Sequence, residues 1–344
     1  MRIIDSHTHI GNIKDGFEPI FALAKRLNYE KFAVMSTQCG GNLLQNLTGA
    51  LCKIKHPGVV YAFGGLDYLT GRSMREQAEN LKAFGFDGMK MLEGKPTTRR
   101  KLNLDVNDPI YTDYFKLCEE TRFPVLLHIA DPPEFWDKDK VPSWALEHGW
   151  YYDETDVPYK QYYDEVAEML GRHPRLTAIF AHFYFMSDRP EQAQRFLDDH
   201  PNVLIDVTAG IEMYENFSLD PDFWRAFFIK NQDRIIFGTD STDSAEVPAE
   251  ADPNGKVDLR GYAGMEIEFL GSDKTVAIYG KKINGINLPE DTQRRILSDN
   301  FYNLVGEPKK LDIAALKKEA AFIRGFLKKD EDKKTLDYIA AELG

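Results

Sequence analysis

The feature that most constrains this chain is a series of short apolar runs, rich in β-branched residues, that recur over its first 240 residues. The runs are continuously apolar, which is typical of strands covered on both faces. Their starts lie 27 to 52 residues apart, which leaves room for a strand, a helix and two loops. Eight runs are found, at residues 2–6, 32–36, 59–64, 87–92, 124–128, 176–182, 203–208 and 234–240. Eight successive βα units predict an α/β protein whose strands close into a (β/α)8 TIM barrel.

The longest interval contains an insertion, at residues 130–161, between the fifth strand and its helix. It holds seven aromatic residues, which are Phe135, Trp136, Trp144, Trp150, Tyr151, Tyr152 and Tyr159. A long loop inside a compact domain is usually functional or has a small core of its own. Two interpretations therefore stay open. The insertion is a lid or pocket wall, with Trp136 touching the substrate, or its aromatic residues simply pack it onto the barrel.

The region after the eighth run is less regular. Residues 241–285 begin rich in glycine, aspartate and proline and end in a predicted small hairpin, with strands at 275–278 and 283–286. Helix returns at 289–305, and a charged helical region follows to the end of the chain. We predict one catalytic domain at 1–310 and a C-terminal helical extension at 311–344. The extension is expected to pack on the barrel or on a partner subunit.

Composition narrows the class of protein. The formal net charge is −12, so nucleic acid and anionic membrane surfaces are not expected partners. The three cysteines, Cys39, Cys52 and Cys118, have no paired close spacing, which fits a reducing compartment. No segment is long and apolar enough to span a bilayer, and the first residues carry no apolar signal core. We therefore expect a cytoplasmic protein that acts on a small molecule, with a homodimer as the oligomeric state to consider.

The first run leads into His7-Thr8-His9. Successive side chains on a strand point to opposite faces, so His7 and His9 should share a face, with Asp5 below them. Two imidazoles on one face can hold a metal ion from one side. Ordinary polar residues at a junction between strand and loop would give the same short pattern, so the motif alone does not establish a metal site.

Barrel enzymes carry their chemistry at the carboxyl ends of the strands. The polar residues at the predicted ends are His7, His9, Lys90, His128, His182 and Asp240. Three other histidines precede a proline where a helix should end, which is a structural explanation for His56, His173 and His200. His148 lies in the insertion. Imidazoles with a carboxylate suit a divalent metal, Zn2+ first, with Mn2+, Fe2+ or Co2+ as alternatives.

With these residues in view, the sequence resembles the metal-dependent amidohydrolase superfamily, specifically its amidohydrolase-2 branch. That branch includes enzymes of the aminocarboxymuconate-semialdehyde decarboxylase type. The resemblance covers residues 3–305, and its marks are Ile4-Asp5-Ser6-His7-Thr8-His9, Pro124-Val125-Leu126-Leu127-His128, Ala181-His182, Phe237-Gly238-Thr239-Asp240 and Ile296-Leu297-Ser298-Asp299-Asn300. It implies one divalent ion held by His7, His9, His128 and Asp240. It also implies that His182 is an acid/base or substrate-orienting residue.

Lys90 has three interpretations. In binuclear amidohydrolases a carboxylated lysine on the fourth strand bridges two metals, and His182 would then bind the second ion. In the mononuclear branch, which the sequence resembles more, Lys90 would attract a substrate carboxylate. A simple buried ion pair is the third interpretation. Nearby, Lys95 follows the fourth strand in Glu93-Gly94-Lys95-Pro96, where a turn alone explains the glycine and proline.

The leading functional hypothesis is a hydrolase that attacks a carbonyl-type bond of a small, carboxylated substrate with a metal-activated water. Asp240 would take the proton from the water, and His182 would hold or polarise the carbonyl oxygen. The alternative is a non-oxidative decarboxylase of a small cyclic acid on the same site. A non-catalytic binding protein that kept the barrel is the third hypothesis.

Overall fold

Eight parallel strands and a short closing strand form one sheet in the computed structural model, which describes residues 1–344 except 12, 14–15, 209, 243–259 and 279. The strands are β1 (Ile4–His9), β2 (Lys31–Met35), β3 (Val60–Gly64), β4 (Gly88–Gly94), β5 (Val125–Ile129), β6 (Ala178–Phe180), β7 (Val203–Asp206), β8 (Ile235–Ile236) and β9 (Ser241–Thr242). Each strand pairs with the next in sequence from β1 to β8, and β9 pairs with β1. The Ser6 N–H also donates to the Phe237 carbonyl at 3.0 Å, so the segment of β8 and β9 closes the ring. The predicted TIM barrel is confirmed.

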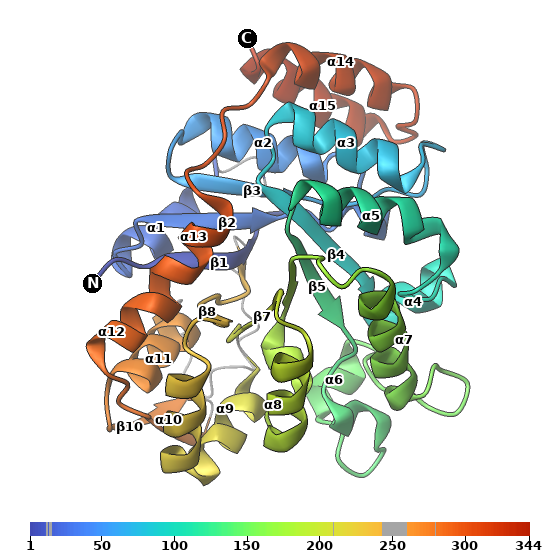
Figure 1. The fold of residues 1–344 in the computed structure, drawn as a ribbon. Helices are drawn as coiled ribbons and strands as arrows, with labels where there is room; N and C mark the ends of the chain where they lie inside the picture. Colours follow the sequence, from blue (N-terminus) through green and yellow to red (C-terminus); the bar gives the residue numbers. More distant parts are fainter. Residues whose placement is uncertain (12, 14–15, 209, 243–259, 279) are drawn as a thin grey trace.

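Helices surround the sheet (Figure 1). They are α1 (Glu18–Arg26), α2 (Gln45–Lys55), α3 (Met74–Phe84), α4 (Pro96–Leu102), α5 (Thr112–Thr121), α6 (Ser143–Glu147), α7 (Tyr159–Arg172), α8 (Pro190–Asp199), α9 (Ile211–Leu219), α10 (Pro221–Lys230) and α11 (Arg260–Gly271). The histidines before proline lie where expected, at the C-terminal caps of α2, α7 and α8.

The barrel interior is packed with side chains and closed at one end. Apolar residues from seven strands fill it, including Ile4, Ala33, Met35 and Leu126. Phe301, on α13 (Asn300–Val305), is fully buried at the amino ends of the strands, with its ring edge-on to Tyr61 at 5.3 Å. Because this end is filled, the carboxyl ends of the strands are where a site can open.

The insertion has a small core of its own. Phe135, Val141, Ala145 and Tyr152 are buried against one another between a 3-10 turn (Pro133–Trp136) and α6. The Trp136 indole N–H donates to the Val157 carbonyl at 3.1 Å. The aromatic residues of the insertion therefore pack largely against one another, and its role as a lid or pocket wall stays a prediction.

The hairpin is confirmed with a corrected second strand. Its strands are β10 (Thr275–Ile278) and β11 (Lys281–Asn284), so β11 begins two residues earlier than predicted. Ile278 pairs directly with Lys281, and Gly280, at φ +72°, makes the tight reversal. The segment predicted as a loop, residues 241–285, also contains α11, which the sequence did not indicate. Residues 243–259 of this segment lie outside the described part.

The end of the chain is helical, as predicted. After α12 (Glu290–Arg294), a π-helical turn (Arg295–Asp299) leads into α13, and α14 (Ile313–Arg324) and α15 (Asp330–Glu342) follow. Figure 1 shows α14 and α15 beside α2 and α3 on the outside of the barrel. Arg72 donates to both carboxylate oxygens of Glu319 at 2.7 Å, which ties α14 to the barrel. The boundary at 310 and the homodimer stay predictions. Within the described residues, no helix is long and apolar enough to cross a membrane.

Candidate metal centre

An extra residue in β1 determines where its polar side chains point. Asp5 pairs with Phe32, but Thr8 pairs with Val34, so three steps along β1 match two along β2. Such a bulge reverses the alternation of faces. Ile4 lies in the barrel interior and its neighbour Asp5 faces outward, where its carboxylate accepts hydrogen bonds from the N–H and hydroxyl of Thr239. The expectation that Asp5 lies below the two histidines is therefore wrong.

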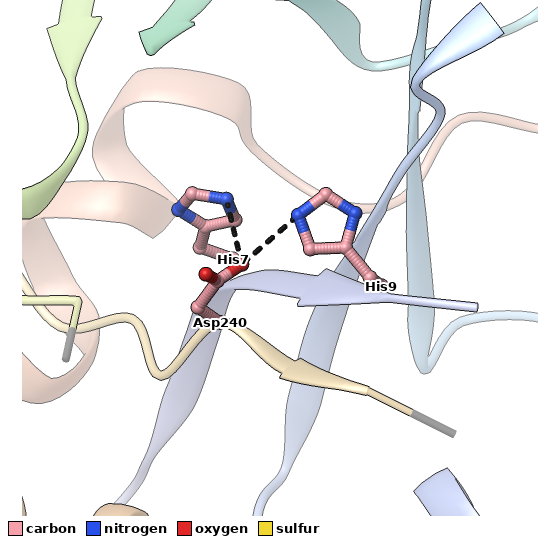
Figure 2. A group of neighbouring side chains, drawn as sticks. All are labelled: His7, His9 and Asp240. Atoms are coloured by element: carbon pink, nitrogen blue, oxygen red, sulfur yellow. Dashed lines mark ion pairs between the residues drawn. The ribbon is translucent and has the colours of Figure 1, made fainter. Parts of the chain in front are cut away.

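His7, His9 and Asp240 converge at the mouth of the barrel (Figure 2). The Oδ1 atom of Asp240 lies 3.0 Å from His9 Nε2 and 3.5 Å from His7 Nε2, and one ligand atom from each residue lies within 4.8 Å of the others. Ligand atoms that share a tetrahedral ion at 2.0–2.1 Å stand about 3.3 Å apart, so these separations fit one divalent cation. Two imidazoles with a carboxylate suit Zn2+, Fe2+ or Mn2+.

A buried carboxylate orients His7. His7 Nδ1 lies 3.0 Å from Asp206 Oδ2 and 3.1 Å from Thr208 Oγ1. Because a carboxylate only accepts, Nδ1 carries the hydrogen and Nε2 keeps its lone pair for a metal. Burial, with the charge of Lys90, lowers the pKa of His7 to about 4, although Asp206 opposes this. His7 is therefore neutral at pH 7, the form that binds metal.

Lys90 lies against this group of three. Its Nζ is 2.8 Å from His7 Nε2, and its side chain is buried. Burial lowers the pKa of Lys90 to about 8, and the charges of Asp240 and Asp206 oppose the shift. Within the described residues no carboxylate oxygen lies within 4.0 Å of its Nζ, which leaves the simple ion pair without support.

His128 and His182 form a second group. Their Nδ1 and Nε2 atoms lie 3.2 Å apart, and His128 Nε2 lies 3.2 Å from Asp131 Oδ1. The structure does not bring His128 into the group of three ligand atoms described above. Asp131 is held by Lys95 at 2.6 Å and by the Tyr152 hydroxyl at 2.5 Å. Burial alone would raise its pKa, but Lys95 and His128 lower it to about 2.

His182 does not lie on a strand, because β6 ends at Phe180. It begins a turn in which all four residues, His182 to Phe185, have φ between +47° and +57°. Left-handed conformations cost non-glycine residues roughly 1–2 kcal/mol each, so packing must impose this turn. The His182 N–H donates to Asp206 Oδ1 at 2.8 Å, and its ring stacks on Phe185. Asp206 thus fixes both His182 and His7.

A small cavity beside His182 involves the start of the insertion. Its walls are Pro132, Pro133 and Glu134 from the insertion, His182, Phe185, Ser187 and Asp188 from the turn after β6, and Glu212, Met213 and Asn216 from α9. The insertion therefore contributes to the site through its first residues. Trp136 is instead in contact with Tyr152, Tyr159 and Tyr162, and its role toward substrate stays a prediction.

Sequence reasoning missed two carboxylates of this region. Asp131 is the second residue after β5, and Glu93 lies within β4, one residue beyond the predicted end of that strand. The position of Asp131, three residues after His128 at a strand end, was the available signal. Nothing in the apolar pattern marked Glu93 as part of the strand.

Solved structures of other proteins share the fold of this chain. A search of curated proteins found no match. The chain is similar in fold to an uncharacterised TIM-barrel protein from Bordetella bronchiseptica, at 13% identity and a TM-score of 0.55 over 88% of this chain and 98% of that chain. It is also similar to a 4-oxalomesaconate hydratase from Rhodopseudomonas palustris (12% identity, TM-score 0.53, 94% of this chain and 98% of that one). A third is a 2,6-dihydroxybenzoate decarboxylase from Rhizobium (15% identity, TM-score 0.51, 88% and 98%).

Structural similarity at such low identity shows the fold alone. The sequence itself matches the amidohydrolase family model, in its amidohydrolase-2 form, over residues 4–305. The match spans all the barrel strands and the residues at their carboxyl ends. The chain belongs to the amidohydrolase-2 family of metal-dependent enzymes.

Proposed function

We propose that this protein is a metal-dependent hydrolase that acts on a carbonyl-type bond of a small, carboxylated substrate. The convergence of His7 Nε2, His9 Nε2 and Asp240 Oδ1 at the mouth of the barrel carries the proposal. A divalent ion at this position supplies a water of lowered pKa and polarises a carbonyl group.

The surrounding residues have complementary roles. Asp240 takes the proton from the attacking water and passes it to the leaving group. Burial lowers the pKa of His182, so its neutral imidazole can donate a hydrogen bond to the carbonyl oxygen. Lys90, which has no carboxylate partner in the described structure, attracts the carboxylate of the substrate.

The test is turnover of a panel of small carboxylated amides and lactones by protein loaded with Zn2+ or Mn2+. Asp240→Asn should lower turnover about 100- to 10,000-fold, as expected for loss of a general base. Its melting temperature should stay close to that of the wild type, because Asp240 is at the mouth and not in the core. Full turnover in this variant would refute the role of Asp240.

A non-oxidative decarboxylase is the second candidate, and it is favoured by Lys90, which lies beside the metal group and has no carboxylate partner among the described residues. A carboxylate held there would lie close to His182 and Asp240, and a proton taken up from solvent by one of them would be delivered to the carbon that loses CO2. The solved neighbours of the same fold include a hydratase and a decarboxylase, and they assign neither activity to this chain. Release of CO2 by a cyclic acid, with no uptake of water, would establish the second candidate.

The number of ions is a separate proposal. We propose one ion, Zn2+ by preference, on His7, His9 and Asp240, with His128 as the fourth ligand. The 3.2 Å between His128 Nδ1 and His182 Nε2 equally suits two ligands of a second ion, bridged by a carboxylated Lys90. Metal analysis separates the two. A content of two metal ions per chain in the wild type, falling to one in Lys90→Ala, would overturn the mononuclear proposal.

A further inference from the structure

Glu93 is a buried carboxyl group at the mouth of the barrel that the metal centre does not use. A bulge in β4 places it there: Lys90 and Met91 pair with Leu126 and Leu127, but Gly94 already pairs with Ile129. Three steps along β4 match two along β5, so Lys90 and Glu93 share the inner face although they are three residues apart. Glu93 is 2% exposed.

One of its oxygens is held firmly. The Tyr68 hydroxyl donates to Glu93 Oε1 at 2.9 Å, and it also lies 2.7 Å from the Tyr111 hydroxyl. A hydroxyl has one hydrogen, so Tyr111 must be the donor to Tyr68. This chain of hydrogen bonds uses both tyrosine hydrogens and fixes the carboxyl group through Oε1.

The other oxygen is free. Glu93 Oε2 is buried and has no hydrogen-bond partner among the described residues. Lys90, on the same face of β4, has its Nζ 2.8 Å from His7 Nε2, so the carboxyl group of Glu93 lies on the side of the barrel mouth that carries the metal group. Buried polar atoms are almost always satisfied in native proteins, and an exception calls for an explanation such as a catalytic role or a bound ion, water or substrate group.

We propose that Glu93 is a specificity-determining residue whose Oε2 accepts a hydrogen bond from a hydroxyl or amino group of the substrate. The substrate class is then a small carboxylated compound with an O–H or N–H donor on its side facing β2 to β4. This inference rests on the proposed function, since it needs a substrate anchored at the metal group and Lys90.

The test compares pairs of carboxylates that differ only in a hydroxyl or its methyl ether, such as 3-hydroxybenzoate with 3-methoxybenzoate and 3-hydroxypropanoate with 3-methoxypropanoate. Their dissociation constants are measured by calorimetry on Mn2+-loaded wild type, Glu93→Gln and Glu119→Gln. Gln at position 93 can still accept from Tyr68 but presents an NH2 where Oε2 stood. Glu119, a carboxylate on the outer helix α5 with 10% exposure, controls for the chemical change.

We expect the wild type and Glu119→Gln to bind at least one hydroxyl compound tenfold or more tightly than its ether. Glu93→Gln should lose that preference and bind the ether within twofold of wild type, a change that a merely structural carboxyl would not produce. Binding without a hydroxyl preference, or a preference kept by Glu93→Gln, overturns the role of Glu93 alone. If no carboxylate binds the loaded wild type, the proposed function fails as well.

Discussion

Replacing Asp206 by Asn should weaken metal binding although Asp206 touches no metal. It is fully buried, and its Oδ1 accepts the N–H groups of His182 and Thr208 at 2.8 and 3.1 Å. Its Oδ2 faces His7 Nδ1 at 3.0 Å and so selects the tautomer with a free Nε2 lone pair. Asn keeps an oxygen for the two N–H groups but turns an NH2 toward His7 Nδ1.

That exchange favours the other tautomer of His7, in which a hydrogen on Nε2 occupies the lone pair that would bind the metal. Loss of such an orienting partner lowers metal affinity about 10- to 100-fold. The loss corresponds to about 1.4–2.8 kcal/mol of binding free energy. Alanine would be a poorer test, because it would leave two buried N–H groups without an acceptor.

Calorimetric titration of metal-free protein with Zn2+ measures the effect. Thr208→Val is the matched control: Thr208 Oγ1 lies 3.1 Å from the same His7 nitrogen, but Asp206 remains to select the tautomer. We expect the control to bind Zn2+ within about threefold of wild type, as the carboxylate supplies the orienting charge. Wild-type affinity in a folded Asp206→Asn protein would refute this reasoning.

Three further predictions concern pH and stability. The pKa of His7 is about 4 in the folded protein and about 6.5 in the unfolded chain, so as pH falls from 7 to 4 the proton binds mainly to the unfolded state and the free energy of unfolding decreases. His7→Asn lacks this loss, so its free energy of unfolding should rise relative to that of wild type by up to about 3 kcal/mol over the same range, as measured by urea unfolding at each pH. Equal pH profiles for the two proteins would contradict the low pKa. Arg72→Ala removes the hydrogen bonds to both Glu319 oxygens and the contact of the guanidinium with the Phe322 ring, whose centroid lies 3.6 Å away. The free energy of unfolding should fall by about 1–3 kcal/mol, with partial recovery when the charges of Arg72 and Glu319 are exchanged in a double variant. Phe301→Ala leaves a cavity at the closed end of the barrel and should lower the free energy of unfolding by about 3–5 kcal/mol. A decrease under 1 kcal/mol would mean that the interior is not packed there.

The barrel could be predicted because strands buried on both faces leave continuous apolar runs in the sequence. The run at 203–208, for example, contains β7. α11 could not be predicted, since its sequence contains Gly261 and Gly264, which disfavour helix. Burial of Phe269 and Leu270 against the barrel outweighs that preference.

The candidate site was predictable only in outline. Strand-end positions pointed to His7, His9, Lys90, His128, His182 and Asp240, and the structure brings the first two together with Asp240. The bulges in β1 and β4 insert a residue without changing the apolar pattern, so the sequence could not give the true orientation of Asp5 or the inner position of Glu93. The left-handed turn at His182 was equally hidden, because none of its residues is glycine.

The most direct test is a crystal structure of Zn2+-loaded protein, with the ion located by anomalous scattering at the zinc edge. The account predicts a peak about 2.0–2.2 Å from His7 Nε2, His9 Nε2 and a carboxylate oxygen of Asp240. A peak elsewhere, or none in protein saturated with zinc, would contradict the assignment of these three residues as the metal centre.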